Sequence, residues 1–205
     1  MPDEFFPLNS QRFEEALRRF DAENNCDPNV EEENGLHHAR ELLYAKRLSD
    51  WVLRLCPNAG EELRLAARCQ HLCRWIIPRE SFPMTRAGYL QWREELKKFH
   101  AKKAGEILRD TGYPNAVISR VQALNLKKNF PNDPEGRVLE DALCLVFLQY
   151  QFAALAEKTS EHKMINALQK SWNKMTPAGR IHAKELAYNE KQRVLLEKAL
   201  GALEP

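Results

Sequence analysis

The sequence predicts an all-α protein from three observations. Only 8 of its 205 residues are glycine, too few for the many tight turns of a β-sandwich or barrel. Apolar residues recur at helical spacing along most of the chain, and strict alternation of apolar and polar residues is missing. Neither a G-x-G-x-x-G nor a G-x-x-x-x-G-K motif occurs, so the sequence does not indicate a nucleotide-binding α/β fold.

The first three helices are predicted from apolar stripes and end signals. A stripe of phenylalanine, alanine and leucine predicts the first helix over Ser10–Asn24, and residues 25–35 follow as an acidic loop. The second helix covers His38–Leu55. The third runs from Gly60 to Trp75 and is stopped by Pro78.

A stiff loop at residues 76–84, with two prolines and no glycine, separates these helices from the rest. Asp133 is a good N-cap for a later helix that is apolar nearly all round, which is typical of a central, buried helix. The remaining helices are predicted over Thr85–Asp110, Pro114–Lys127, Pro134–Ala156, Ser160–Lys174 and Thr176–Leu203.

The composition sets the domain organisation. An apolar share of 43% and a charged share of 29% let a chain of 205 residues bury one full core, so we expect a single domain of about eight helices. We divide it into an acidic N-terminal region at 1–35, a core at 38–158 and a C-terminal helical pair at 160–203. The start resembles no signal peptide, and the longest apolar stretch, Ala142–Leu148, is too short to span a bilayer. We therefore expect a cytoplasmic protein with no membrane partner.

Cysteines and charges narrow the chemistry. The 5 cysteines form no paired C-x-x-C motifs, which disfavours a disulfide framework or a structural zinc site. Cys69 and Cys73, four residues apart on the predicted third helix, fit small core residues better than metal ligands. Residues 85–128 hold ten basic and four acidic side chains. This segment either forms the solvated face of a helix or meets a phosphate-bearing ligand.

One candidate site ends the predicted third helix. His71, Arg74 and Trp75 are spaced i, i+3, i+4 and would share one helical face. Imidazole binds metals or moves protons, guanidinium grips phosphate or carboxylate, and indole stacks on planar ligands. The structural alternative is a polar helix end packed by one tryptophan.

Two further places could carry chemistry. Glu140 and Asp141 open the buried helix, where a charge needs a partner such as an arginine, a metal or a helix N-terminus. Tyr89, Trp92 and Arg93 share one face of the fourth helix and lead into a run of lysines. Aromatic residues interleaved with basic ones suit nucleic acid or nucleotide phosphate, and a core seam beside a solvated face explains them equally well.

Six segments resemble the family called domain of unknown function 4202, and the likeness covers residues 13–200. They are FDAENNCDPN (20–29), ELLYAKRLSDW (41–51), LAARCQHLCRWIIPR (65–79), FPMTRAGYLQWREELKKFHA (82–101), LEDALCLVFL (139–148) and KSWNKMTPAGR (170–180). The resemblance implies no established activity.

The arrangement is more distantly similar to the HD superfamily of metal-dependent phosphohydrolases, which are all-α. That similarity matches Asp141 to the last metal-binding aspartate and gives the early ligand to His38, or to Glu41 in its place. It departs at Gln70-His71, where the superfamily has His-Asp, and glutamine is a poor ligand for a transition metal.

The leading hypothesis is an HD-like, metal-dependent hydrolase of a small phosphorylated or nucleotide-like substrate. The predicted roles are catalytic for His71, Glu41 and Arg74, substrate-binding for Arg79, Arg93, Trp75, Tyr89, His100 and Gln70, and binding of a divalent transition metal for His71, Asp141 and His38. One alternative is a non-catalytic helical module that binds RNA, a protein or a small ligand. Another is an HD-like iron oxygenase, because histidine and carboxylate ligands suit iron. The leading hypothesis needs His71 and Asp141 to face a shared cavity.

Overall fold

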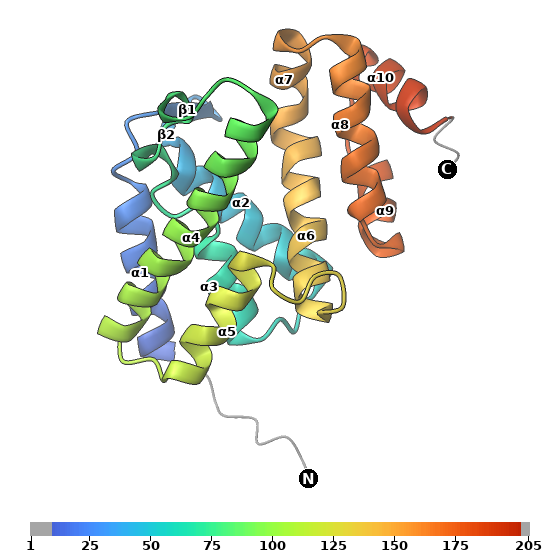
Figure 1. The fold of residues 1–205 in the computed structure, drawn as a ribbon. Coiled ribbons are helices and arrows are strands. Elements are labelled where there is room, and N and C mark those ends of the chain that lie inside the picture. The colour runs from blue at the N-terminus through green and yellow to red at the C-terminus, as the bar shows by residue number, and fades with distance from the viewer. Residues whose placement is uncertain (1–9, 202–205) are drawn as a thin grey trace. The chain divides into compact units, whose positions relative to one another are not determined.

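The computed structural model describes residues 10–201 and confirms the all-α fold class (Figure 1). Its helices are α1 (Ser10–Asn24), α2 (Arg40–Leu55), α3 (Glu61–Cys69), α4 (Arg86–Asp110), α5 (Asn115–Leu126), α6 (Pro134–Val146), α7 (Phe152–Lys158), α8 (Glu161–Lys174), α9 (Pro177–Lys184) and α10 (Glu190–Leu200). A two-stranded hairpin of β1 (Val30–Glu33) and β2 (Leu36–Ala39) precedes α2.

The described chain forms two compact units. The first comprises the residues up to Ser49 together with 58–129, and the second comprises 50–57 together with the residues from Phe130 onward. In the first unit, α4 packs along α5, while α3 packs against both α5 and α1. The predicted stripe of α1 is confirmed, because Phe13, Ala16 and Phe20 are all buried.

The prediction of an acidic loop over residues 25–35 is wrong for its second half. Strands β1 and β2 pair antiparallel around an Asn34-Gly35 turn in which both residues have positive φ, 53° and 76°. Asn-Gly is the pair that favours a two-residue hairpin turn, and the search for longer strands overlooked it. His38 consequently lies on β2 opposite Glu31, and α2 begins at Arg40 rather than at His38.

The third helix also differs from its prediction. Helix α3 ends at Cys69, and the chain then turns through Cys73, whose φ is 55°, into a short 3-10 turn at Arg74–Ile76. The predicted shared helical face of His71, Arg74 and Trp75 therefore does not exist. Cys69 and Cys73 do not lie on one helix, although both are buried core residues as expected.

The proline-rich loop before α4 is held by one arginine. The Arg79 guanidinium donates to the carbonyls of Phe82 and Pro83, at 3.0 and 2.7 Å, and more weakly to that of Thr85. The Thr85 hydroxyl then caps α4 by accepting the Gly88 N–H. Helices α4 and α5 follow their predicted ranges to within one residue at each end.

In the second unit, the apolar run is one long helical segment with an interruption. Asp133 caps α6 as predicted, and a five-residue π-helical segment, Phe147–Gln151, leads into α7. Among the described residues, Pro134–Lys158 is long and apolar enough to cross a membrane by length and composition. Half of its most apolar window is buried, and core helices of water-soluble proteins pass the same test.

The C-terminal region contains one helix more than expected. Helix α8 matches the predicted segment at 160–174, but the single helix expected from Thr176 to Leu203 is wrong, because α9 and α10 are separate. Helix α10 begins with a capping box in which Asn189 and Gln192 each satisfy the other's backbone N–H. Helices α7, α8 and α10 pack together in this unit.

Candidate functional site

A buried carboxyl group lies at the start of α2, in the first unit. Glu41 is 7% exposed, and its backbone N–H donates to Asp27 Oδ2 at 3.0 Å. Its Oε2 atom has no hydrogen-bond partner among the described residues. A buried polar atom without a partner is uncommon in folded proteins and is often found where a ligand or water binds.

His71 faces this carboxyl group from the turn after α3. Its Nδ1 atom lies 3.5 Å from Glu41 Oε2, and its ring stacks on that of Tyr44 with 4.2 Å between centroids and 13° between planes. Burial, and then the nearby Arg74 guanidinium, hold the pKa of His71 well below its usual range. The imidazole is therefore neutral, and a neutral imidazole can accept a proton or a ligand.

A second histidine lies behind the first. His100 on α4 is 3% exposed, and its ring centroid is 5.9 Å from that of His71. Its Nδ1 lies 2.7 Å from the Leu72 carbonyl, which can only accept, so Nδ1 carries the proton and Nε2 offers a lone pair. Nε2 has no partner among the described residues, and burial lowers the pKa of His100 to about 3. His100 thus lies inside the site, not on the exposed face predicted for substrate binding.

Arg74 connects the buried carboxyl group with the surface. Its Nε atom is 3.8 Å from Glu41 Oε1, and its guanidinium lies 4.8 Å from the centre of the Trp92 ring. Burial raises the pKa of Glu41 to about 7, although the positive charge of Arg74 opposes the shift. Because the side chains of His71 and Arg74 are 22% and 28% exposed, they are the parts of this cluster that solvent reaches.

Arginines and aromatic rings alternate outward from this point. Arg79 lies over both Trp92 and Tyr89, at 5.9 and 6.0 Å from the ring centres. Arg93 donates to the Tyr89 hydroxyl at 3.2 Å and is exposed. Since Arg79 is already bonded to three loop carbonyls, its first role is to hold the loop, which leaves Arg74 and Arg93 as the guanidinium groups open to a ligand.

The other predicted first-unit residues lie at the edge of this cluster. Gln70 is 6% exposed, and its Oε1 atom has no partner among the described residues. Trp75 is half-buried in the 3-10 turn, and His38 is half-buried on the hairpin.

Asp141 belongs to the second unit and has partners there. Its Oδ1 accepts the Thr176 N–H at 2.8 Å, and its Oδ2 accepts the Thr176 hydroxyl, so it anchors the start of α9. The neighbouring Glu140 pairs with Lys174 Nζ at 3.0 Å. Because His71 belongs to the first unit, a cavity shared by His71 and Asp141 stays a prediction.

The residues present do not fit a metal ion in this arrangement. Within residues 10–201, no three side chains of His, Cys, Asp or Glu are placed to hold one together. The predicted set of His71, Asp141 and His38 therefore forms no such group.

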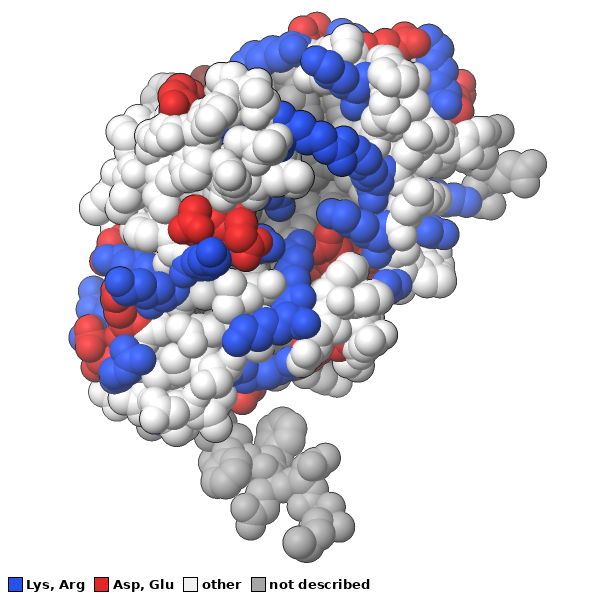
Figure 2. Space-filling model, in the orientation of Figure 1, with Lys and Arg blue, Asp and Glu red and all other residues white. Residues whose placement is uncertain are grey.

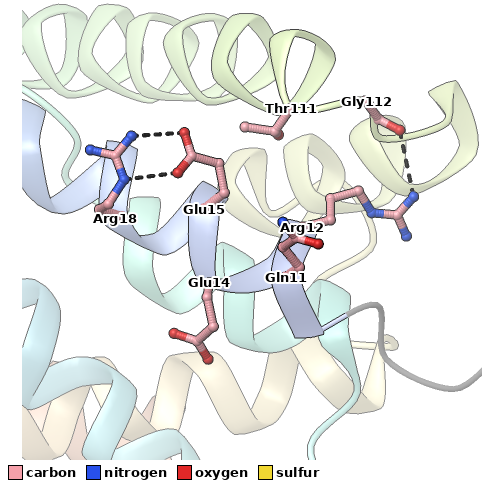
Figure 3. Close-up of a pocket in the computed structure, with 7 residues that line it drawn as sticks. All are labelled: Gln11, Arg12, Glu14, Glu15, Arg18, Thr111 and Gly112. Carbon is pink, nitrogen blue, oxygen red and sulfur yellow. Dashed lines mark hydrogen bonds and ion pairs between the residues drawn. The ribbon is translucent and has the colours of Figure 1, made fainter.

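The pocket drawn in Figure 3 lies elsewhere in the first unit, between the start of α1 and the end of α4, and has a volume of about 670 Å³. Its carboxylate Glu15 is bonded to Arg18 and Arg19, which lower its pKa to about 2. Figure 2 shows acidic and basic side chains intermixed on this part of the surface. With its carboxylate already paired, the pocket lacks a group that could transfer a proton near neutral pH.

Three contributors to the site were missed from the sequence: Asp27, Asn24 and Tyr44. Asp27 and Asn24 belong to the segment FDAENNCDPN, where a run of Asp and Asn just past a helix is the available signal, since such side chains bond to backbone groups. Asn24 Oδ1 accepts the Cys73 N–H at 3.0 Å. No sequence signal indicated that Tyr44 stacks on His71.

Comparison with known proteins gives one match. The model of a family described as Domain of unknown function (DUF4202) matches residues 14–196, which confirms the resemblance to that family. No curated protein and no solved structure matches the chain. The more distant similarity to HD phosphohydrolases gains no support from these comparisons.

Proposed function

Because the chain belongs to the DUF4202 family, whose description names no activity, we propose its function from the chemistry of the site: a hydrolase of a small phosphate-bearing, nucleotide-like substrate. One observation carries the proposal. The buried carboxyl group of Glu41, with an unpartnered oxygen, lies beside a neutral imidazole and a half-exposed guanidinium. A proton acceptor next to an anion-binding group is what hydrolysis of a phosphate ester requires.

Glu41 acts as the general base in this proposal. Its pKa of about 7 leaves a large fraction ionised at neutral pH while keeping it basic enough to take a proton from water. The water oxygen forms a bond to phosphorus, the bond from phosphorus to the leaving oxygen breaks, and the proton held by Glu41 passes to that oxygen. His71, within 3.5 Å of the carboxyl group, orients the water through its neutral ring.

Arg74 and Arg93 bind the phosphate. Guanidinium groups form paired hydrogen bonds with phosphate oxygens, and a flat aromatic surface beneath a guanidinium limits its movement. Arg74 lies over Trp92 and Arg93 lies beside Tyr89, so both are held before a ligand arrives. The same aromatic rings provide an apolar wall for a nucleotide base.

A metal-assisted form of the reaction follows from the HD-like motif. It needs three ligands that the described residues do not bring together, so no step here passes through an ion. Metal analysis of protein purified without chelator tests that form, which expects about one or two bound ions per chain.

The test is hydrolysis of a panel of nucleoside mono-, di- and triphosphates and simple phosphate esters. Glu41→Gln and His71→Ala should each lower kcat by about 100-fold or more, since general-base catalysis contributes about 100- to 10,000-fold. The exposed Glu106 on α4 supplies the matched control, Glu106→Gln, with unchanged rates. Turnover that survives Glu41→Gln, or no turnover of any panel member, contradicts the proposal.

The alternation of arginine and aromatic side chains also favours a second candidate, a module that binds single-stranded RNA without catalysis. Base stacking on aromatic rings and salt-sensitive phosphate contacts characterise such binding. RNA affinity that falls steeply with salt and with Tyr89→Ala, and that survives Glu41→Gln, would select this candidate over the hydrolase.

A further inference from the structure

The turn that carries His71 and Arg74 depends on a side chain from another helix. Cys73 lies between these two residues with a φ of 55°, a conformation that residues other than glycine rarely adopt. Its backbone N–H donates to Asn24 Oδ1 at 3.0 Å. Asn24 is the last residue of α1 and is 0% exposed.

We propose that Asn24 is a positioning residue for the site: by holding Cys73 in the left-handed conformation, it turns both His71 and Arg74 toward Glu41. The inference rests on the proposed function for the roles of Glu41 and His71. Its structural part, which links Asn24 to the orientation of His71, can be tested without any activity.

The neighbouring contacts support this role. Two residues before the turn's end, the Leu72 carbonyl accepts from His100, which fixes one side of the turn. On the other side, Glu23 accepts from the Cys73 thiol at 3.4 Å and pairs with Lys103 at 2.8 Å. These contacts hold a carbonyl and a side chain. The backbone N–H of Cys73, whose direction depends on the left-handed conformation, is held by Asn24.

The stacked rings provide a direct readout. Because His71 lies flat on Tyr44, the ring current of Tyr44 shifts the proton resonances of His71, and those resonances report whether His71 keeps its place. The variants are Asn24→Ala, Cys73→Gly and the double variant. Asn125→Ala is the matched control, since Asn125 is equally buried in the same unit but donates to Cys69 Sγ and not to the turn.

Asn24→Ala should remove the ring-current shift of His71, and Asn125→Ala should leave it in place. Glycine adopts positive φ without steric cost, so Cys73→Gly should keep the shift and should restore part of it in the double variant. For any substrate found, Asn24→Ala should lower kcat by about 10- to 100-fold, the expected effect of a small misplacement of catalytic groups.

A folded Asn24→Ala protein with an unchanged His71 spectrum overturns the proposal. If Asn24→Ala does not fold, the double variant decides: a folded protein with the shift present supports the proposal, and one that is unfolded or lacks the shift contradicts it. Failure of the proposed function has a different signature, because the spectrum would respond to Asn24→Ala as described while no phosphate ester is hydrolysed.

Discussion

Asp27 and Glu41 are 14 residues apart in the sequence, and Asp27 Oδ2 accepts the backbone N–H of Glu41 at 3.0 Å. The other carboxylate oxygen accepts the backbone N–H of Asn29 at 2.9 Å, so one side chain ties the entry of the hairpin to the start of α2. Because the bonded N–H belongs to Glu41 itself, this contact fixes the backbone from which the candidate base projects.

Replacing Asp27 should therefore destabilise the protein in a graded way. Asp27→Ala should lower the free energy of unfolding by about 1 kcal/mol, the typical loss when a capping side chain is removed, and Asp27→Asn should lower it by less because the amide oxygen still accepts. Urea unfolding followed by circular dichroism measures both. Equal losses for the two variants would show that the charge, and not the capping bond, matters.

The pH dependence of stability should reveal the raised pKa of Glu41. Between its ordinary value of 4.5 and about 7, the folded state keeps a proton that the unfolded state releases. The contribution of Glu41 to stability is then fully present below pH 4.5 and falls as the pH rises through 7, by about 3 kcal/mol in total.

The comparison uses Glu41→Gln, which does not titrate. The stability of the wild type relative to Glu41→Gln should fall between pH 5 and pH 8. Taking this difference cancels the two buried histidines, whose lowered pKa values act in the opposite sense and cost stability as the pH falls below 6.5. A difference that stays constant over this range would place the pKa of Glu41 near its ordinary value.

Gly35 tests the hairpin turn. Its φ is 76° and a Cβ atom there would touch nothing within 4 Å, so Gly35→Ala changes only the backbone preference. We expect a loss of about 1 kcal/mol in the free energy of unfolding, because a left-handed residue with a Cβ atom is disfavoured by roughly that amount. Asn34→Gly, at the other positive-φ position, should cost nothing. Thermal unfolding of the two variants checks the contrast.

Gly179 tests the anchor at the start of α9. A Cβ atom at this position would lie 2.6 to 2.9 Å from the carboxylate atoms of Asp141, too close for any real contact. Gly179→Ala should displace the carboxylate from Thr176 and cost about 1–3 kcal/mol, the usual penalty for overpacking. Its neighbour Ala178 is exposed, so Ala178→Ser serves as the control. Equal melting temperatures for both would contradict the packing.

Local signals in the sequence predicted the helices well where they were strong. Thr85 and Asp133 were identified as helix starts because each combines a capping side chain with a following apolar pattern, and both accept N–H bonds in the structure. The extension of α3 to Trp75 failed because nothing local ends the helix at Cys69. That end depends on Asn24, which is 49 residues away from Cys73 in the sequence.

The site was predicted in part for the same reason. Glu41, His71 and Arg74 were chosen for their chemistry, and the structure brings them together, but through a turn and not through a shared helical face. Residue type alone could not show that Arg79 would be occupied by loop carbonyls. It also could not show which unit would contain Asp141, since that depends on contacts between distant segments.

The π-helical segment at Phe147–Gln151 has a consequence for insertions and deletions. A π turn accommodates one residue more than an α turn, so the chain here contains a surplus residue within an otherwise regular helix. Deleting one residue from this segment should restore a continuous α-helix and rotate everything after it by about 100° about the axis, since an α-helix has 3.6 residues per turn. Phe152, now fully buried, would then point in a new direction. The length of this segment, more than its composition, sets the face that α7 presents to its neighbours.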